Sequence, residues 1–93
     1  MISGSGETPI TLHLARRALD VDAHLLAVTA DVNSTLARLA HAVVEVSTTG
    51  TGQFGGTLFE QSALLLLDAM ILKLTADDPQ AYAVMKARHT NMQ

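Results

Sequence analysis

Close to the N-terminus, a run of small residues separates an apolar residue from the predicted start of a helix. Ile2 leads into Ser3-Gly4-Ser5-Gly6-Glu7, and Thr8-Pro9 then supplies a hydroxyl residue and a proline, which begin many helices. Small residues between a strand and a helix form a common phosphate cradle, because they let backbone N–H groups approach an anion. Such a cradle follows a parallel strand, and almost none of that strand precedes Ser3. We therefore expect the second half of an α/β domain.

Strand-like and helix-like segments alternate after this loop. Residues 24–30 indicate a strand that is buried on both faces, because the segment is short and almost continuously apolar. A short helix capped by Asn33 or Ser34 follows, and residues 43–47 predict a second strand. A strand, a helix and a strand joined by short links predict a parallel sheet with crossover helices.

The first predicted helix, residues 9–20, has a polar and an apolar face. Its polar face carries, at helical spacing, His13, Arg16, Arg17 and Asp20. Its apolar face includes Ile10, Leu14 and Ala18, so we expect these side chains to face the core.

Residues 57–76 predict a long helix that is apolar on nearly every side. Gln61, Asp68 and Thr75 form a thin polar line along it. A helix that is apolar all round must be covered all round, so we expect it to contact another subunit or a missing half of the domain. Asp78-Pro79 is expected to cap a last helix that ends near residue 89.

The composition limits the classes of protein to consider. Of the 93 residues, 48% are hydrophobic and 16% are charged, which is enough for the core of one domain. A net charge of −3 and scattered basic residues argue against nucleic-acid binding. The longest unbroken apolar run, residues 63–67, is far shorter than the roughly 20 residues of a membrane helix. The absence of cysteine fits a cytoplasmic protein.

Three blocks of the sequence share their order and spacing with a known family. They are residues 2–8, then Gly56-Thr57-Leu58-Phe59-Glu60-Gln61-Ser62-Ala63-Leu64 with residues 67–74, and lastly Lys86-Ala87-Arg88-His89-Thr90-Asn91-Met92. Together they resemble the sugar isomerase (SIS) domain family, and within it the 6-phospho-3-hexuloisomerases. Phe54-Gly55 and Met92 depart from the family pattern. The resemblance implies that residues 1–93 are the C-terminal half of a flavodoxin/Rossmann-like SIS domain, with parallel strands, crossover helices and a long apolar C-terminal helix.

The resemblance also implies an activity and the residues that carry it. The family interconverts a 3-hexulose 6-phosphate and fructose 6-phosphate by proton transfer, without a metal or other cofactor. By resemblance, Glu60 is the base, and His89 reaches a neighbouring subunit's site as a proton shuttle or a substrate ligand, which makes it the candidate acid. The phosphate would be held by Ser3, Gly4, Ser5, Gly6 and Thr8. Family sites lie at subunit contacts, commonly in tetramers, and the helix at 57–76 suits such a contact.

Simpler interpretations of the same residues remain open. A glycine–serine segment also suits a flexible linker, and Glu60 and His89 would each be favoured by the dipole at their own helix ends. His13, His24 and His41 are expected to be structural, and no metal site is predicted. Two other functions also remain open: a non-catalytic module that binds a sugar phosphate, and an inactive truncated fragment.

Overall fold

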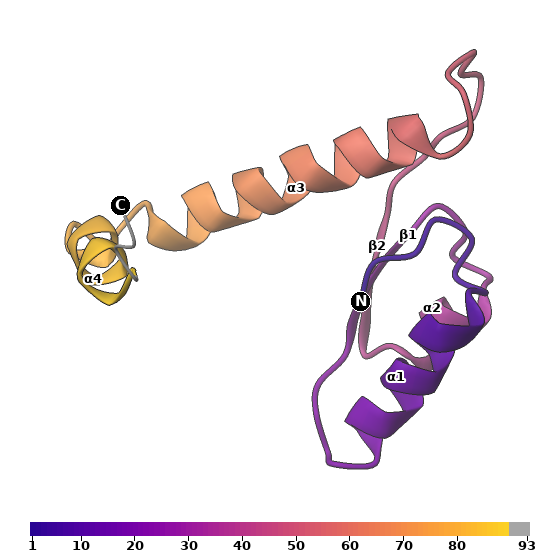
Figure 1. Ribbon diagram of the computed structural model, residues 1–93, viewed down its shortest axis with the longest axis horizontal. Helices are drawn as coiled ribbons and strands as arrows, with labels where there is room; N and C mark the ends of the chain where they lie inside the picture. Colours follow the sequence, from indigo (N-terminus) through magenta and orange to yellow (C-terminus); the bar gives the residue numbers. More distant parts are fainter. Residues whose placement is uncertain (90–93) are drawn as a thin grey trace.

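The computed structural model describes residues 1–89 as a small parallel sheet with helices on both faces and a helical arm (Figure 1). Strands β1 (Leu26–Thr29) and β2 (Ala42–Glu45) pair in parallel, with Ala27 opposite Val43 and Val28 opposite Val44. On the other side of β1, Ile2 forms an isolated parallel bridge with Val28. The predicted parallel sheet is therefore confirmed, and Ile2 adds a single parallel bridge on the side of β1 away from β2.

Strand β1 is buried on both faces, as its apolar sequence predicts. Ala27 belongs to a core cluster with Leu12, Ala15 and Leu36, which come from the helices α1 (Pro9–Leu19) and α2 (Thr35–Leu39). Its neighbour Val28 belongs to a second cluster with Val46, Phe59 and Ala63. Successive strand residues point to opposite faces, so α1 and α2 cover one face of the sheet and the start of helix α3 (Thr57–Thr75) covers the other.

The first helix buries a different face from the predicted one. Leu12 and Ala15 are its buried residues, whereas Ile10 and Leu14 are 62% and 50% exposed. Both faces of α1 carry apolar residues, so spacing alone did not fix which side meets the sheet. Thr8 stands at the N-cap position, as predicted, but its side chain makes no capping hydrogen bond. In α2 the cap is Ser34, whose hydroxyl accepts a 3.3 Å hydrogen bond from the N–H of Ala37.

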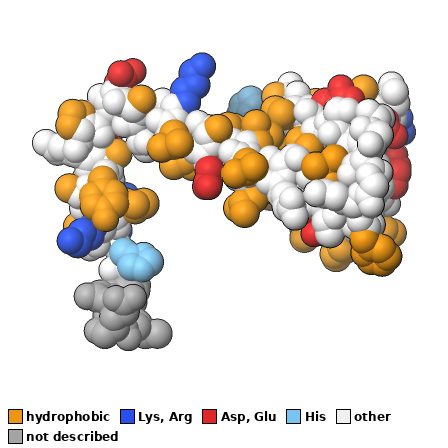
Figure 2. Space-filling model, turned by 90° about the horizontal axis from the view of Figure 1, so that it is seen from above, with side chains coloured by type: hydrophobic (Ala, Val, Ile, Leu, Met, Phe, Trp, Pro, Cys, Tyr) orange, Lys and Arg blue, Asp and Glu red, His pale blue; other side chains and the backbone are white. Residues whose placement is uncertain are grey.

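Helix α3 leaves the sheet as an arm that carries helix α4 (Ala81–Arg88) at its far end (Figure 1). The radius of gyration is 15.9 Å, whereas a compact domain of this length has about 12 Å. The buried residues of α3 are Phe59 and Ala63, both in its first two turns. Most of the arm therefore lies outside the core of this chain, and apolar side chains are spread along its surface (Figure 2).

Two predictions about the C-terminal part need correction. The C-terminal helix is α4, which has 8 residues, so the long apolar helix is the preceding element α3 rather than the last one. Helix α4 begins at Ala81, not at Pro79, because the carboxylate of Asp78 accepts a 2.9 Å hydrogen bond from the N–H of Gln80 and keeps these residues in a turn. Within residues 1–89, no helix combines the length and the apolar character needed to cross a bilayer.

Candidate functional site

The loop of residues 3–8 links the Ile2 bridge to α1, and its own hydrogen bonds hold it in shape. Ser3 is buried, and its hydroxyl accepts a 3.2 Å hydrogen bond from the N–H of Gly6. The same hydroxyl lies 3.2 Å from that of Thr8. The carbonyl oxygen of Gly4 accepts hydrogen bonds from the Ala30 N–H at 3.0 Å and from the Thr29 hydroxyl at 3.2 Å. These contacts tie the loop to the end of β1, which excludes a flexible linker at this position.

Gly6 occupies a position that only glycine fits. Its φ angle is +63°, in the left-handed region that other residues rarely adopt. A Cβ atom at Gly6 would overlap the side chain of Ser34, the cap of α2. The carbonyl oxygen of Gly6 also accepts a 3.0 Å hydrogen bond from the N–H of Leu36. The loop is therefore pressed against the start of α2.

Glu7 makes a second link between the loop and α2. Its carboxylate accepts a 2.6 Å hydrogen bond from the backbone N–H of Thr35. This hydrogen bond is the main reason that the pKa of Glu7 lies below its usual value, and the positive charge of Arg38 acts in the same direction. The side chain of Arg38 donates a hydrogen bond to the Thr35 hydroxyl at 3.0 Å.

Other groups of the loop remain free to meet a ligand. Within residues 1–89, the backbone N–H groups of Gly4, Ser5 and Thr8 donate to no acceptor. Ser5 and Thr8 are exposed, and α1 begins directly after them. The first turn of a helix has N–H groups without a helical partner and carries a partial positive charge. The loop and the start of α1 therefore offer donors to an anion despite the net charge of −3.

The predicted phosphate-binding residues thus divide into two groups. Ser3 and Gly6 are buried, and their polar groups make hydrogen bonds within the loop, to β1 and to α2. Gly4, Ser5 and Thr8 present unpaired N–H groups within the described residues. The structure brings all five residues into one loop, and their geometry gives the first pair the role of shaping it.

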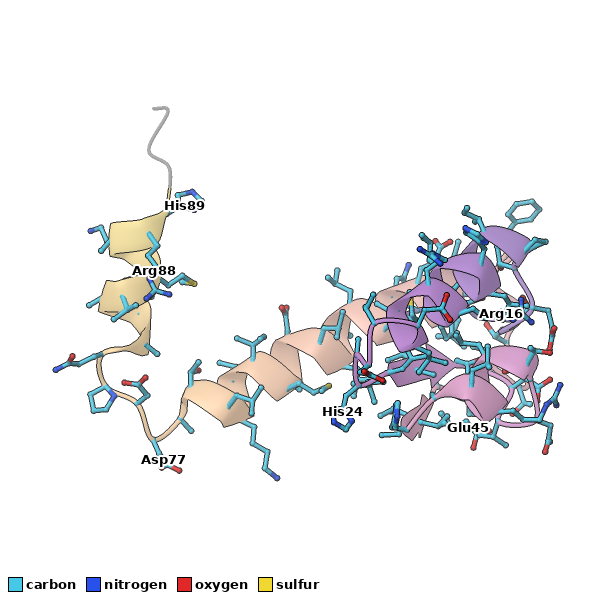
Figure 3. The ribbon with its side chains drawn as sticks, turned by 90° about the horizontal axis from the view of Figure 1, so that it is seen from below. Arg16, His24, Glu45, Asp77, Arg88 and His89 are labelled. Carbon is cyan, nitrogen blue, oxygen red and sulfur yellow. The ribbon has the colours of Figure 1, made fainter. Side chains whose placement is uncertain are left out.

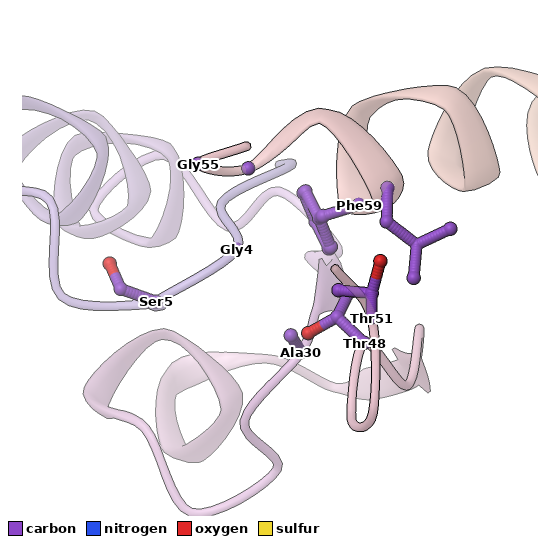
Figure 4. A pocket seen from close by; sticks show the side chains of 9 residues that line it. Gly4, Ser5, Ala30, Thr48, Thr51, Gly55 and Phe59 are labelled. Atoms are coloured by element: carbon purple, nitrogen blue, oxygen red, sulfur yellow. The ribbon is translucent and has the colours of Figure 1, made fainter. Parts of the chain in front are cut away.

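A cavity of about 300 Å³ lies next to this loop, at the carboxyl ends of the strands (Figure 4). The loop contributes Gly4 and Ser5, and Ala30 follows β1. The segment between β2 and the start of α3 contributes Thr48, Thr51, Gly55, Gly56, Leu58 and Phe59. Open parallel sheets bind their ligands in this position, outside the carboxyl ends of the strands.

The wall of the cavity nearest α3 is formed by Phe59. This side chain is 8% exposed and packs with Val28 and Val46. A Cβ atom at Gly4 would lie 3.3 Å from the Cδ1 atom of Phe59, so the loop and the aromatic ring are in close contact. The same ring therefore belongs to the core and to the cavity wall.

Glu60 lies beside the cavity but does not line it. It is exposed on the first turn of α3, and its N–H donates a 3.0 Å hydrogen bond to the carbonyl oxygen of Gly56. A Cβ atom at Gly56 would lie 3.8 Å from the Glu60 carboxylate, which therefore lies over a residue of the cavity. The role of Glu60 as a base stays a prediction.

His89 lies far from this cavity in the same chain. It stands at the C-cap of α4, at the end of the arm (Figure 3). There it borders a separate depression of about 310 Å³, together with Tyr82, Met85 and Lys86. One chain therefore does not bring Glu60 and His89 together, and the expected contact with a neighbouring subunit stays a prediction. Residues 90–92 of the third sequence block lie outside the described residues.

Sequence reasoning missed Thr48 and Thr51, which line the cavity from the segment after β2. One signal was available. Both threonines follow a predicted parallel strand, and the carboxyl ends of neighbouring parallel strands meet at the same edge of a sheet. The sequence could therefore have placed the hydroxyl residues after the second predicted strand at the same edge of the sheet as the residues that follow the first predicted strand.

Comparison with curated proteins adds evidence that geometry alone does not give. Over 100% of its length, the chain is 32% identical to a 3-hexulose-6-phosphate isomerase from Methylomonas aminofaciens, of which it covers 55%. Over 98% of its length, it is 30% identical to a 3-hexulose-6-phosphate isomerase from Bacillus subtilis strain 168, of which it covers 54%. This chain is similar to sugar-phosphate isomerases.

A further relative and a solved structure agree with this similarity. An uncharacterized protein from Archaeoglobus fulgidus is 31% identical to the chain, with 95% of the chain and 53% of that protein covered. A crystal structure of a hypothetical protein superposes with a TM-score of 0.85 at 30% identity, and covers 98% of this chain and 53% of its own. No family model matches the sequence. The chain spans about half the length of the curated relatives it matches.

Proposed function

We propose that the chain is the C-terminal half of a SIS-type domain, in an isomerase that interconverts a 3-hexulose 6-phosphate and fructose 6-phosphate. The similarity to two proteins with the isomerase name supports this proposal. The observation that carries the substrate class is the set of N–H groups at Gly4, Ser5 and Thr8 that have no acceptor within residues 1–89, beside a cavity of about 300 Å³. Such groups suit the phosphate, and the cavity is at the small end of ligand pockets, which suits a monosaccharide.

The reaction needs one base and one acid. A base removes the proton from C2, and an acid protonates O3 as the enediolate forms. The proton then returns to C3 while O2 loses its own, which leaves the ketone at C2. Glu60 is the proposed base, because it lies over Gly56 at the rim of the cavity. His89 is the proposed acid, supplied by a second copy, since the arm holds it far from the cavity of its own chain.

The proposal includes a homo-oligomer, by resemblance a tetramer, formed through the arm. Leu65, Leu72 and Leu74 on α3 are 68%, 71% and 75% exposed. Leu65 and Leu72 share one face of the helix and Leu74 lies on another, and exposed apolar surface of this extent normally lies in an interface. A second copy of this chain is the proposed occupant, because the same apolar helix of that copy would be buried in turn across a two-fold axis.

Measurement of turnover and of binding tests this function. Purified chain is incubated with 3-hexulose 6-phosphate, and formation of fructose 6-phosphate is followed. Glu60→Gln separates an enzyme from a sensor: an enzyme loses turnover and keeps its affinity for fructose 6-phosphate, whereas a sensor has no turnover to lose. Gln61→Glu, at the exposed neighbouring position, is the control that changes the charge of the same turn and leaves Glu60 in place. A wild-type chain that binds the sugar phosphate without turnover supports the binding-module alternative.

A further inference from the structure

We propose that the hydroxyls of Thr48 and Thr51 bind the hydroxyl groups of the sugar, on the side of the cavity opposite the phosphate loop. This inference rests on the proposed function and adds a second part to its site. Figure 4 shows both threonines on the segment that follows β2, facing the space bordered by Gly4 and Phe59. Two separate segments of the chain therefore supply the polar groups of one cavity.

The hydrogen bonds of these threonines leave them able to bind a ligand. The Thr48 hydroxyl makes no hydrogen bond within residues 1–89, so it can both donate and accept. The Thr51 hydroxyl accepts a 3.0 Å hydrogen bond from the N–H of Gln53, which fixes its position and leaves its own proton to donate. A sugar hydroxyl can serve as partner to both.

The threonine between them does not share this role. The hydroxyl of Thr49 lies 3.3 Å from that of Ser47, and Thr49 does not line the cavity. The three threonines have the same side chain and lie within one short segment, so Thr49 provides a matched control. The contrast shows that position, and not residue type, selects Thr48 and Thr51.

The remaining lining indicates which part of the ligand lies there. All the residues that line the cavity are uncharged. Leu58 and Phe59 offer an apolar surface, which suits the C–H groups of a sugar chain, and the two threonines offer neutral hydrogen bonds. The phosphate is accounted for by the N–H groups of the loop. The hydroxyl-bearing carbons therefore extend from the loop toward Thr48 and Thr51.

The test compares two probes on four proteins. Affinities for fructose 6-phosphate and for inorganic phosphate are measured by NMR titration of the wild-type chain, Thr48→Val, Thr51→Val and Thr49→Val. Loss of one neutral hydrogen bond weakens binding about three- to tenfold. We expect this loss for fructose 6-phosphate in Thr48→Val and Thr51→Val, with phosphate affinity unchanged, and no change in Thr49→Val. Thr48→Ser and Thr51→Ser, which keep the hydroxyl, should restore the sugar affinity.

The outcomes separate this inference from the proposed function. If the valine variants bind fructose 6-phosphate as the wild type does, the role of the threonines is wrong and the phosphate site stands. If the wild-type chain binds neither probe, the proposed function and this inference are both wrong. The amide spectra recorded in the same titration report on folding, and the serine variants provide a readout should a valine variant not fold.

Discussion

The backbone N–H of Thr35 donates a 2.6 Å hydrogen bond to the carboxylate of Glu7, so a charged side chain joins the loop of residues 3–8 to the start of α2. This bond is the largest single cause of the lowered pKa of Glu7. A carboxylate with a lowered pKa in the folded state stabilises the fold above its unfolded pKa of about 4.3, and this contribution disappears as the pH falls through the folded value.

Glu7→Gln should therefore destabilise the chain in a pH-dependent way. We expect the difference in thermal midpoint between wild type and variant to be largest above about pH 5 and to shrink as the pH falls below about 4. Thermal unfolding followed by circular dichroism across this range measures it. Glu45→Gln, at an exposed position on the edge strand, is the control. A difference that grows toward acid pH would contradict the link between Glu7 and α2.

Gly6→Ala should cost about 2–4 kcal/mol in the free energy of unfolding. Alanine is strained at a φ angle of +63°, and its methyl group would overlap the Ser34 side chain. Urea denaturation measures the loss. Gly52→Ala is the matched control, because a Cβ atom there would meet nothing within 4 Å, so its effect should stay within about 0.5 kcal/mol. The double variant Gly6→Ala/Ser34→Gly should recover part of the loss, since it removes the overlapping side chain.

Phe59→Ala should destabilise the chain by about 3–5 kcal/mol, because it leaves a void between the sheet and α3. Phe59 is 8% exposed and packs with Val28 and Val46. Phe54→Ala removes the same ring from a position that is 91% exposed, and should change stability by no more than about 0.5 kcal/mol. Equal effects in the two variants would show that α3 does not pack on the sheet as described.

Charge on the arm should break the proposed oligomer and leave the single chain folded. Leu65→Asp and Leu72→Asp each place a carboxylate at a position that is 68% or 71% exposed. We expect sedimentation velocity to show the wild type as an oligomer and these variants shifted toward monomer, with unchanged far-ultraviolet circular dichroism. Asp68→Asn, on the same helix, controls for a change of charge alone. A wild-type chain that sediments as a monomer at high micromolar concentration would disprove the interface.

The elements whose location depends on local pattern could be predicted from the sequence. The apolar segment around β1 identifies a strand buried on both faces, and this is confirmed by the two core clusters on either side of it. The position of α3 also follows from the sequence, with its end one residue from the prediction. The buried face of α1 could not be predicted, because Leu12 and Ala15 compete with Ile10 and Leu14 and only packing on the sheet decides between them.

The candidate site was predictable in location and not in detail. The sequence marks the loop of residues 3–8, but its hydroxyls and N–H groups are indistinguishable until the loop is packed. The hydrogen bond between Gly6 and Ser3 and the contact of Gly6 with α2 bury these two residues, whereas the N–H groups of Gly4 and Ser5 have no acceptor within residues 1–89. Thr48 lies far along the chain from this loop, and only the parallel pairing of the strands brings the two together.

Because Gly4 and Phe59 are in contact, one aromatic ring affects both the shape of the cavity and the packing of α3 on the sheet. A substitution of Phe59 that changes ligand affinity also alters the packing of α3 on the sheet. Conversely, a substitution that changes this packing also moves the wall of the cavity. A change of ligand preference at this end of the cavity would therefore require paired substitutions, whereas the threonine side can vary one residue at a time.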